Sequence, residues 1–301
     1  MYQMMSLPLY SGTLGEYNSW RDLGQELERL GCDGIEGVWG GEDLPKDLPA
    51  ELILGYHLIF YPDWLDFYRD DRAALKQKFG SLEVTASFYG GLGPDTLLEQ
   101  YRADLRRAVN LGARYVVFHV SDVSLEEGYT YRWLHTNQEV IDAAVEVVNL
   151  ILGEERWPFE FLVENQWWPG FTFTEPEETA RLLEGIRFAG KGILLDTGHL
   201  MNACTELKTE AEGADYIRRM LNRHGSLAKW VRGVHLHQSL SGAYVKAHTG
   251  SLPAGLPEDY MERFGVSYQH ILQIDQHRPW TDPAILSVLE QIEPRYLTHE
   301  L

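Results

Sequence analysis

The sequence of 301 residues predicts an α/β fold, a single (β/α)8 barrel domain over residues 1–301. Three observations lead to this prediction. Runs rich in β-branched and aromatic residues recur eight times, amphipathic helical segments separate them, and the total length is typical of such a barrel. No G-x-G-x-x-G motif follows any run, so nothing favours a dinucleotide-binding sheet.

The expected strands are continuous apolar runs, which indicates burial on both faces. They are MMSLPLY (4–10), DGIEGVW (33–39), ELILGYH (51–57), YVVFHV (115–120), FEFLVEN (159–165), GILLD (192–196), WVRGVHLH (230–237) and RYLTHE (295–300). Residues 20–31, 97–112 and 139–153 have helical spacing and each segment closes on a glycine, as helix C-termini commonly do.

The sequence stops directly after the eighth run, so the barrel is expected to lack its last helix. We expect the segment around Phe67 to Phe79, or a partner subunit in a homo-oligomer, to cover the wall there.

Composition restricts the class of partner. The net charge is −19 and the acidic residues are spread along the chain, a field that repels nucleic acid and anionic membranes but favours divalent cations and neutral ligands. The two cysteines, Cys32 and Cys204, form no CxxC pair, and no stretch has the apolar length of a membrane span. These features predict a cytoplasmic protein without nucleic-acid or membrane partners.

Nearly every expected strand ends on a carboxylate or an imidazole, at the barrel end where ligands gather. These residues are Glu36, His57, His119, Glu164, Asp196, His235 with His237, and Glu300. Two-residue alternation then places smaller or branched residues inside the barrel beneath them, namely Ile53, Gly55, Val117, Leu162, Leu194, Gly233 and Thr298.

Each of these polar residues alone has an ordinary structural explanation, but several buried carboxylates at one mouth require a balancing cation. Glu164, Asp196, Glu300 and one of His235 and His237 offer oxygen and nitrogen donors. Such a set suits a divalent metal, Mn, Mg, Co or Zn.

At these motifs the sequence resembles the xylose isomerase-like barrels, which include sugar and sugar-phosphate isomerases and epimerases and the family-2 apurinic endonucleases. DTGH (196–199) is similar to the family's Asp-Thr-x-His after the sixth strand, VEN (163–165) to its fifth-strand glutamate motif and VHL (234–236) to its seventh-strand histidine, while Glu300 stands at its last metal glutamate.

The resemblance implies an isomerase or epimerase of a small sugar-like substrate. Its metal would be held by Glu164, Asp196, His235 and Glu300, and the two glutamates would be catalytic, moving a proton through an enediolate. His199 would hold a substrate oxygen.

Further residues are expected at the substrate. Trp167 and Trp168 follow the fifth strand and can stack on a sugar or, equally well, close the loop over the barrel. His57 and His277 are also expected to contact the substrate. The segment Ser239 to Tyr260 is long and rich in Gly, Ser and Pro, which is typical of a lid.

The alternative is a zinc-dependent phosphodiesterase or abasic-site endonuclease, which the resemblance links to three zinc ions. The additional ligands would come from His57, His119, His199, His237, His248, Asp275 and His277. VKAHTGSL offers His248 but has Lys246 at the aspartate position, whereas IDQH supplies Asp275 and His277 after a long insertion. With 26 basic against 45 acidic residues, the charge favours the isomerase.

Overall fold

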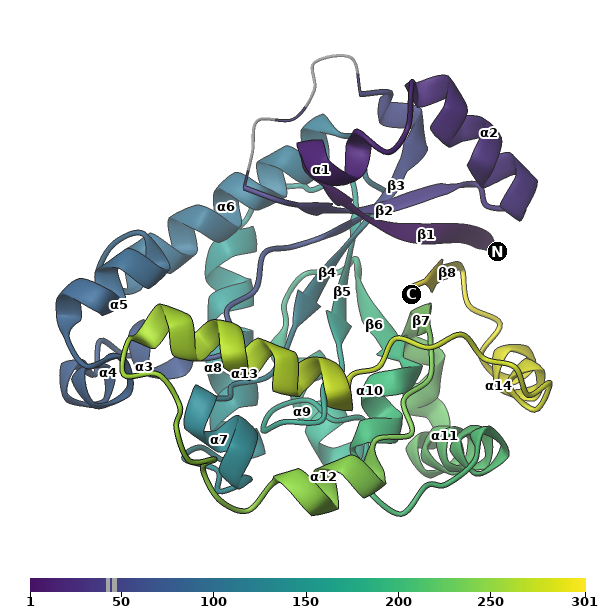
Figure 1. Ribbon diagram of the computed structural model, residues 1–301. Helices are drawn as coiled ribbons and strands as arrows, with labels where there is room; N and C mark the ends of the chain where they lie inside the picture. Colours follow the sequence, from purple (N-terminus) through teal and green to yellow (C-terminus); the bar gives the residue numbers. More distant parts are fainter. Residues whose placement is uncertain (42–43, 45–47) are drawn as a thin grey trace.

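The computed structural model describes residues 1–41, 44 and 48–301, and eight parallel strands close into a barrel in sequence order (Figure 1). The strands are β1 (Tyr2–Leu9), β2 (Gly34–Trp39), β3 (Ile53–His57), β4 (Tyr115–His119), β5 (Glu160–Glu164), β6 (Lys191–Asp196), β7 (Val231–Leu236) and β8 (Tyr296–His299). The α-helices are α1 (Ser11–Leu14), α2 (Trp20–Leu30), α3 (Leu65–Tyr68), α4 (Arg72–Phe79), α5 (Leu82–Tyr89), α6 (Pro94–Asn110), α7 (Leu125–Thr130), α8 (Asn137–Leu152), α9 (Pro176–Gly185), α10 (Thr197–Asn202), α11 (Glu210–His224), α12 (Gly242–His248), α13 (Tyr260–Ile274) and α14 (Ile285–Ile292). Two 3-10 helices are η1 (Ala50–Leu52) and η2 (Gly225–Trp230).

The predicted barrel is confirmed, and each of the eight runs overlaps one of its strands. The three helical segments correspond to α2, α6 and α8. Gly31 and Gly112 follow two of them with φ of 74° and 75°, a left-handed backbone that glycine adopts without a Cβ penalty. Local sequence signals therefore specify both the strands and the ends of these helices.

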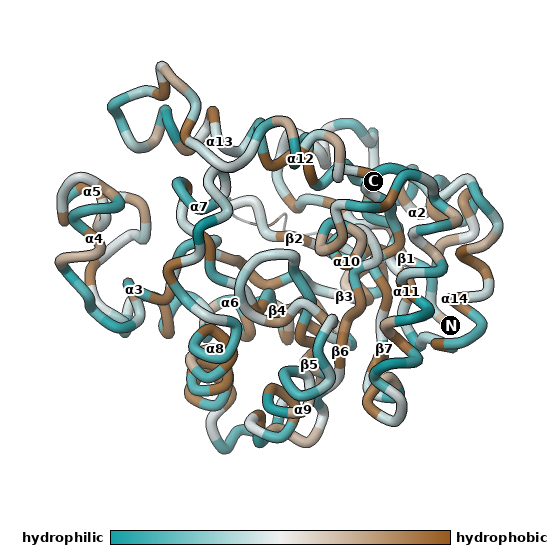
Figure 2. Tube along the Cα trace, turned by 90° about the horizontal axis from the view of Figure 1, so that it is seen from below, coloured by the Kyte–Doolittle hydropathy of each residue, from teal (hydrophilic) through white to brown (hydrophobic). Residues whose placement is uncertain are grey.

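Apolar side chains form one layer inside the barrel and a larger one between strands and helices. The inner cluster is Met4, Leu54, Tyr115, Val117, Leu162, Leu194 and Tyr296. Figure 2 shows the strands surrounded by helices, with α8 and α9 on one side and α12 and α13 on another.

The prediction for Ile53 is wrong. Ile53 belongs to the outer layer and its neighbour Leu54 to the inner cluster. The pairing of β2 with β3 shifts register between Ile35 and Glu36, and a one-residue slip exchanges the faces of a strand. Gly55 returns to the expected position, where a Cβ would lie 2.3 Å from the Tyr115 ring, so glycine leaves room for that ring.

The segment around Phe67 to Phe79 does not cover the wall beside β8. Phe67 stacks on Tyr89 with ring centroids 3.8 Å apart, and Phe79 packs on Tyr260 at 4.4 Å. These contacts keep α3 and α4 next to α5 and α13, on the opposite side of Figure 1 from β8. Aromatic packing at the mouth therefore decides the place of this segment.

The long excursion between β7 and β8 contributes α12 and α13, which lie with α7 and α10 on the side where β4 to β7 end (Figure 1). Phe264 of α13 contacts Phe88, and His270 stacks on Tyr129 of α7 at 4.3 Å. Among the helices of the described residues, none is both long and apolar enough to cross a bilayer.

Candidate metal centre

Strand ends and the loops after them bring histidines and carboxylates into three adjoining groups. The His57 group is His57, His119 and Glu164; the Glu300 group is Glu164, Asp196, His235 and Glu300; the Asp275 group is His199, His237, Asp275 and His277. Within each group one donor atom per residue lies within 4.8 Å of the others. Each group could hold a metal ion.

Glu164, at the end of β5, belongs to two of the groups and contacts His199 of the third. Its Oε2 lies 3.1 Å from His119 Nε2 and 3.3 Å from His57 Nε2. Its Oε1 lies 3.4 Å from His235 Nδ1 and 3.2 Å from His199 Nδ1. One carboxylate thus faces imidazoles from four different elements.

Of His235 in β7 and His237 just after it, His235 accompanies the carboxylates of the Glu300 group. His235 Nδ1 is 3.0 Å from Glu300 Oε2 and 3.7 Å from Asp196 Oδ2. Its Nε2 is 2.8 Å from Glu36 Oε1, so the ring donates its proton to Glu36 and turns Nδ1 towards the group. His237 instead joins the Asp275 group, with Nε2 2.8 Å from Asp196 Oδ2.

The Asp275 group contains the IDQH pair and not His248. Asp275 Oδ2 lies 2.8 Å from His277 Nε2 and 3.2 Å from His199 Nε2. His248 is on an exposed face of α12, where its ring stacks on Tyr244 at 4.1 Å. The local likeness of VKAHTGSL was therefore misleading, because α12 turns that histidine away from the barrel mouth.

Four imidazoles are held by one ring nitrogen and face the groups with the other. Besides His235, the Nδ1 atoms of His57, His199 and His277 lie 2.8, 3.0 and 3.2 Å from the carbonyl oxygens of Leu58, Asn165 and Glu300. A carbonyl can only accept, so Nδ1 carries the proton and Nε2 keeps its lone pair. This arrangement is typical of histidines that bind metals.

Several buried polar atoms of the three groups have no hydrogen-bond partner, a pattern expected where a cation binds. They are both carboxylate oxygens of Glu164, His235 Nδ1, His237 Nδ1, Asp275 Oδ1 and Glu300 Oε2. Burying such atoms unpaired is costly. The donor set of imidazoles and carboxylates suits zinc or a similar divalent ion.

The protonation of the carboxylates agrees with this fit. Burial raises the pKa of Glu164, but the neighbouring His119 and His235 lower it more, and the net pKa lies well below the usual range. Burial lowers the pKa of His119, and the attraction of Glu164 only partly reverses this, whereas at His57, His199 and His235 burial is outweighed by the nearby carboxylates, which raise the pKa. The carboxylates thus draw protons to the imidazoles, and a metal ion would displace these protons on binding.

A cavity of about 800 Å³ opens over these donors. His57, His119, His199, His277 and Glu300 line one end. Trp167 and Trp168, both more than nine-tenths buried, also line it, and the Trp167 ring lies 5.0 Å from that of His199. The structure thus brings the expected substrate-binding residues to one cavity.

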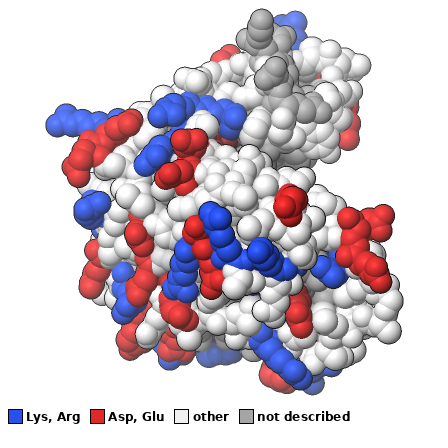
Figure 3. All heavy atoms as spheres, turned by 90° about the vertical axis from the view of Figure 1, so that its left-hand side faces the viewer, with Lys and Arg blue, Asp and Glu red and all other residues white. Residues whose placement is uncertain are grey.

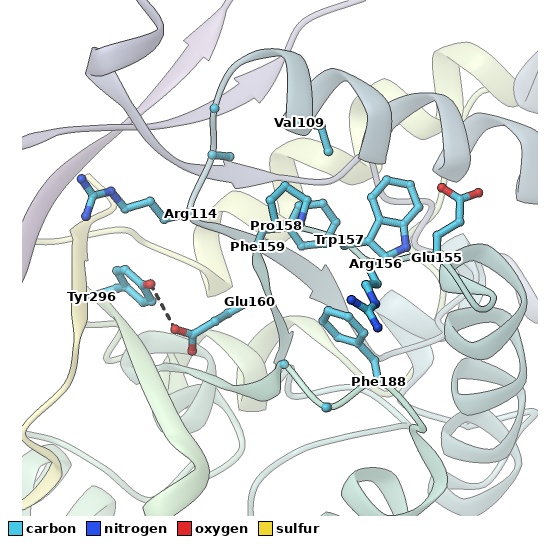
Figure 4. Close-up of a pocket in the computed structure, with 14 residues that line it drawn as sticks. Val109, Arg114, Glu155, Arg156, Trp157, Pro158, Phe159, Glu160, Phe188 and Tyr296 are labelled. Atoms are coloured by element: carbon cyan, nitrogen blue, oxygen red, sulfur yellow. Dashed lines mark hydrogen bonds between the residues drawn. The ribbon is translucent and has the colours of Figure 1, made fainter.

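A second cavity, of about 910 Å³, lies at the other end of the barrel (Figure 4). Several of its polar groups have protein partners: the Tyr296 hydroxyl donates to Glu160 at 3.2 Å and the Trp157 indole N–H to the Leu152 carbonyl at 2.9 Å. Arg295 also pairs with Glu160. These partners leave Tyr296, Trp157 and Glu160 without need of a ligand.

Glu36 was expected at the barrel mouth, but no role was predicted for it. It is fully buried on β2 and also accepts a hydrogen bond from the Tyr115 hydroxyl at 2.6 Å. A carboxylate inside the apolar run GIEGVW was the available signal, but its partner His235 is distant in sequence.

Comparison with known structures supports the barrel. Endonuclease IV from Thermus thermophilus is 16% identical with a TM-score of 0.50, covering 100% of this chain and 92% of that one. Mannonate dehydratase from Streptococcus suis serotype2 is 14% identical with a TM-score of 0.53, covering 99% and 83%. A D-tagatose 3-epimerase-like protein is 16% identical with a TM-score of 0.50, covering 100% and 90%.

At such identities these likenesses show the fold alone, although the proteins compared are named for enzymes. No curated protein sequence matches the chain. The family model described as xylose isomerase-like TIM barrel matches residues 25–287. This match spans most of the barrel and every donor except Glu300, and the chain belongs to the xylose isomerase-like TIM barrel family.

Proposed function

We propose that the protein is a hydrolase that cleaves an ester of phosphoric acid at a centre of three divalent ions, with zinc as the preferred metal. The observation that carries this proposal is the three adjoining donor groups, two of which share Glu164. An isomerase needs only the Glu300 group, whereas a hydrolase of this kind would use all three.

The His57 group would hold one ion, the Glu300 group a second and the Asp275 group a third. Ions bound side by side there would supply Lewis acidity and would neutralise the charge on the attacking and the leaving oxygen. The four anchored imidazoles keep their positions before substrate arrives, because a backbone carbonyl or Glu36 already fixes each ring.

Glu300 is the carboxylate best placed for proton transfer. Its side chain retains 19% exposure and lines the cavity, whereas that of Glu164 is 1% exposed. In the proposed step a water oxygen forms a bond to phosphorus as its proton passes to Glu300. The ester P–O bond breaks with its electron pair on the departing alcohol oxygen, which takes up a proton, so one water and one ester give one alcohol and one phosphate.

Isomerisation or epimerisation of a small carbonyl compound is the second candidate. The observation in its favour is that Glu164 and Glu300 belong to the same group, which supplies the two carboxylates needed to remove and return a proton. In this case the His57 and Asp275 groups would bind substrate or stay protonated.

Metal content tests the two candidates. Protein purified without chelator and reloaded with zinc should contain three ions per chain by inductively coupled plasma mass spectrometry, and it should release p-nitrophenol from p-nitrophenyl phosphate or its diester. A single ion per chain, together with conversion of a ketose to its epimer, would replace the hydrolase by the isomerase.

A further inference from the structure

The cavity over the donor groups has a second end, whose lining residues would take no part in binding metal. Beyond the donors it extends beneath α13, whose Tyr260 and Phe264 line it together with Phe88. Phe88 packs on Phe264 at 5.3 Å, and on the other side His270 Nε2 lies 3.2 Å from the Gly128 carbonyl of α7. α13 is thus tied down on both sides, and its cavity has the size of a small-molecule site.

Several polar side chains at this end already have protein partners. The Ser267 hydroxyl donates to the Arg263 carbonyl at 2.8 Å, and the Tyr61 hydroxyl to Gln100 Oε1 at 2.5 Å. The Ser124 hydroxyl donates to Glu127 at 2.5 Å. A ligand rich in hydroxyl groups would lose its hydrogen bonds to water and find few partners here besides the unpaired indole N–H groups of Trp167 and Trp168, which disfavours binding.

The charge of the cavity excludes a polyanion. No Lys or Arg is among its described lining residues, and the cationic Lys78 near its wall is taken up by Asp63 and Asp66. On the face that carries α4, α5 and α6, basic side chains are interspersed with acidic ones (Figure 3). Nucleic acid is normally gripped by several Lys and Arg contacts to phosphates.

We infer that the substrate is a small monoanionic or dianionic ester with a flat aromatic group, which stacks among the aromatic side chains beneath α13 while its phosphate lies at the donor groups. This inference rests on the proposed hydrolase for the reacting group, but the aromatic specificity comes from the cavity alone. Stacked aromatic rings add stability beyond the apolar area that they bury.

Two stable phosphonates separate binding from catalysis. Phenylphosphonate and 2-hydroxyethylphosphonate carry the same anionic group and cannot be hydrolysed at the P–C bond. By isothermal titration to the zinc-loaded protein, phenylphosphonate should bind at least about tenfold more tightly. Phe264→Ala should remove most of this preference, whereas Val266→Ala, on an exposed position of the same helix, should keep it.

Equal affinity for the two phosphonates, or a preference that Phe264→Ala leaves intact, would overturn the inference. If Phe264→Ala fails to fold by circular dichroism, Tyr268→Ala replaces it, because Tyr268 lines the same cavity from α13 but is 52% exposed. Cleavage of duplex DNA at an abasic site would also contradict the inference. A clear phenyl preference in a protein that hydrolyses no phosphate ester would instead overturn the proposed function and leave only the aromatic specificity of the cavity standing.

Discussion

Two groups of buried carboxylates reach the same cavity, one through Asp63 and the other through Asp275 and Glu300, and they differ in the source of their counter-charge. In the Lys78 cluster, made of Asp63, Asp66, Asp122, Lys78 and His135, the ammonium group lies 2.7 Å from Asp63 Oδ1 and 2.6 Å from Asp66 Oδ2. Burial lowers the pKa of Lys78, but the charges of Asp63 and Asp122 raise it more, so the ammonium stays charged.

The metal centre has carboxylates just as deeply buried, but only imidazoles face them. Its Glu164 has no hydrogen bond on either oxygen, while Asp122 in the Lys78 cluster accepts two backbone N–H bonds at 2.8 Å. Buried carboxylates need compensation in either place. The difference teaches that the chain encodes its own cation where the carboxylates serve the fold, and leaves the cation to be supplied where they would serve chemistry.

The largest expected effect on the fold comes from removing the built-in cation. Lys78→Met leaves the carboxylates of the Lys78 cluster without their main counter-charge, and loss of one partner of a buried pair typically costs about 3–5 kcal/mol. The measurement is the free energy of unfolding in urea. Lys76→Met, on an exposed position of the same helix, should change it by less than about 0.5 kcal/mol. Similar free energies of unfolding for both variants would mean that the Lys78 cluster does not stabilise this region.

Removing the shared carboxylate of the metal centre should have the reverse effect, a large loss of bound metal with a smaller loss of stability. Glu164→Gln should reduce metal content by two ions per chain, because Glu164 belongs to both the His57 and the Glu300 group. In chelator-treated protein the same change should lower the melting temperature by less than Lys78→Met does, because the four imidazoles that contact Glu164 form no hydrogen bond with it.

The matched control for that change is Glu99→Gln, an exposed glutamate of α6, which should alter neither metal content nor melting. If Glu164→Gln destabilised chelator-treated protein by several kcal/mol, the carboxylate would already be compensated within the chain and the comparison of the two groups would fail.

A smaller effect is expected from Glu36, which acts through His235. Glu36→Gln weakens the hydrogen bond that fixes the His235 ring, and loss of such a partner typically lowers metal affinity by about 10–100-fold. Affinity is measured by competition with a chromophoric chelator, and the visible spectrum of the cobalt-loaded protein reports the geometry. An unchanged affinity and spectrum would reduce Glu36 to a packing role.

Most of the donors of the metal centre could be predicted because two-residue alternation and parallel order are local properties. Once Glu164, Asp196 and His235 were placed at strand ends, the closed barrel had to bring them together. The assignment of Glu164 and Glu300 as catalytic stays a prediction.

What could not be predicted depends on contacts across the chain. The register shift between Ile35 and Glu36, which places Ile53 in the outer layer, cannot be seen in the apolar pattern of either strand. The choice of His235 over His237 follows from Glu36 on a strand far away in sequence. The place of Asp275 and His277 depends on how α12 and α13 cross the mouth, which spacing alone does not fix.

The smallest expected effect concerns His248, the candidate that local similarity favoured. Its Nδ1 lies 2.9 Å from the Tyr244 carbonyl oxygen and donates to it, on an exposed stretch of α12. His248→Ala should therefore leave the ion count unchanged and the unfolding free energy within about 0.5 kcal/mol. Asp275→Asn, its counterpart in the Asp275 group, should lose one ion. Loss of an ion from His248→Ala would show that α12 moves into the barrel mouth when metal binds. The bound metal ion would then change the position of a helix as well as complete the site.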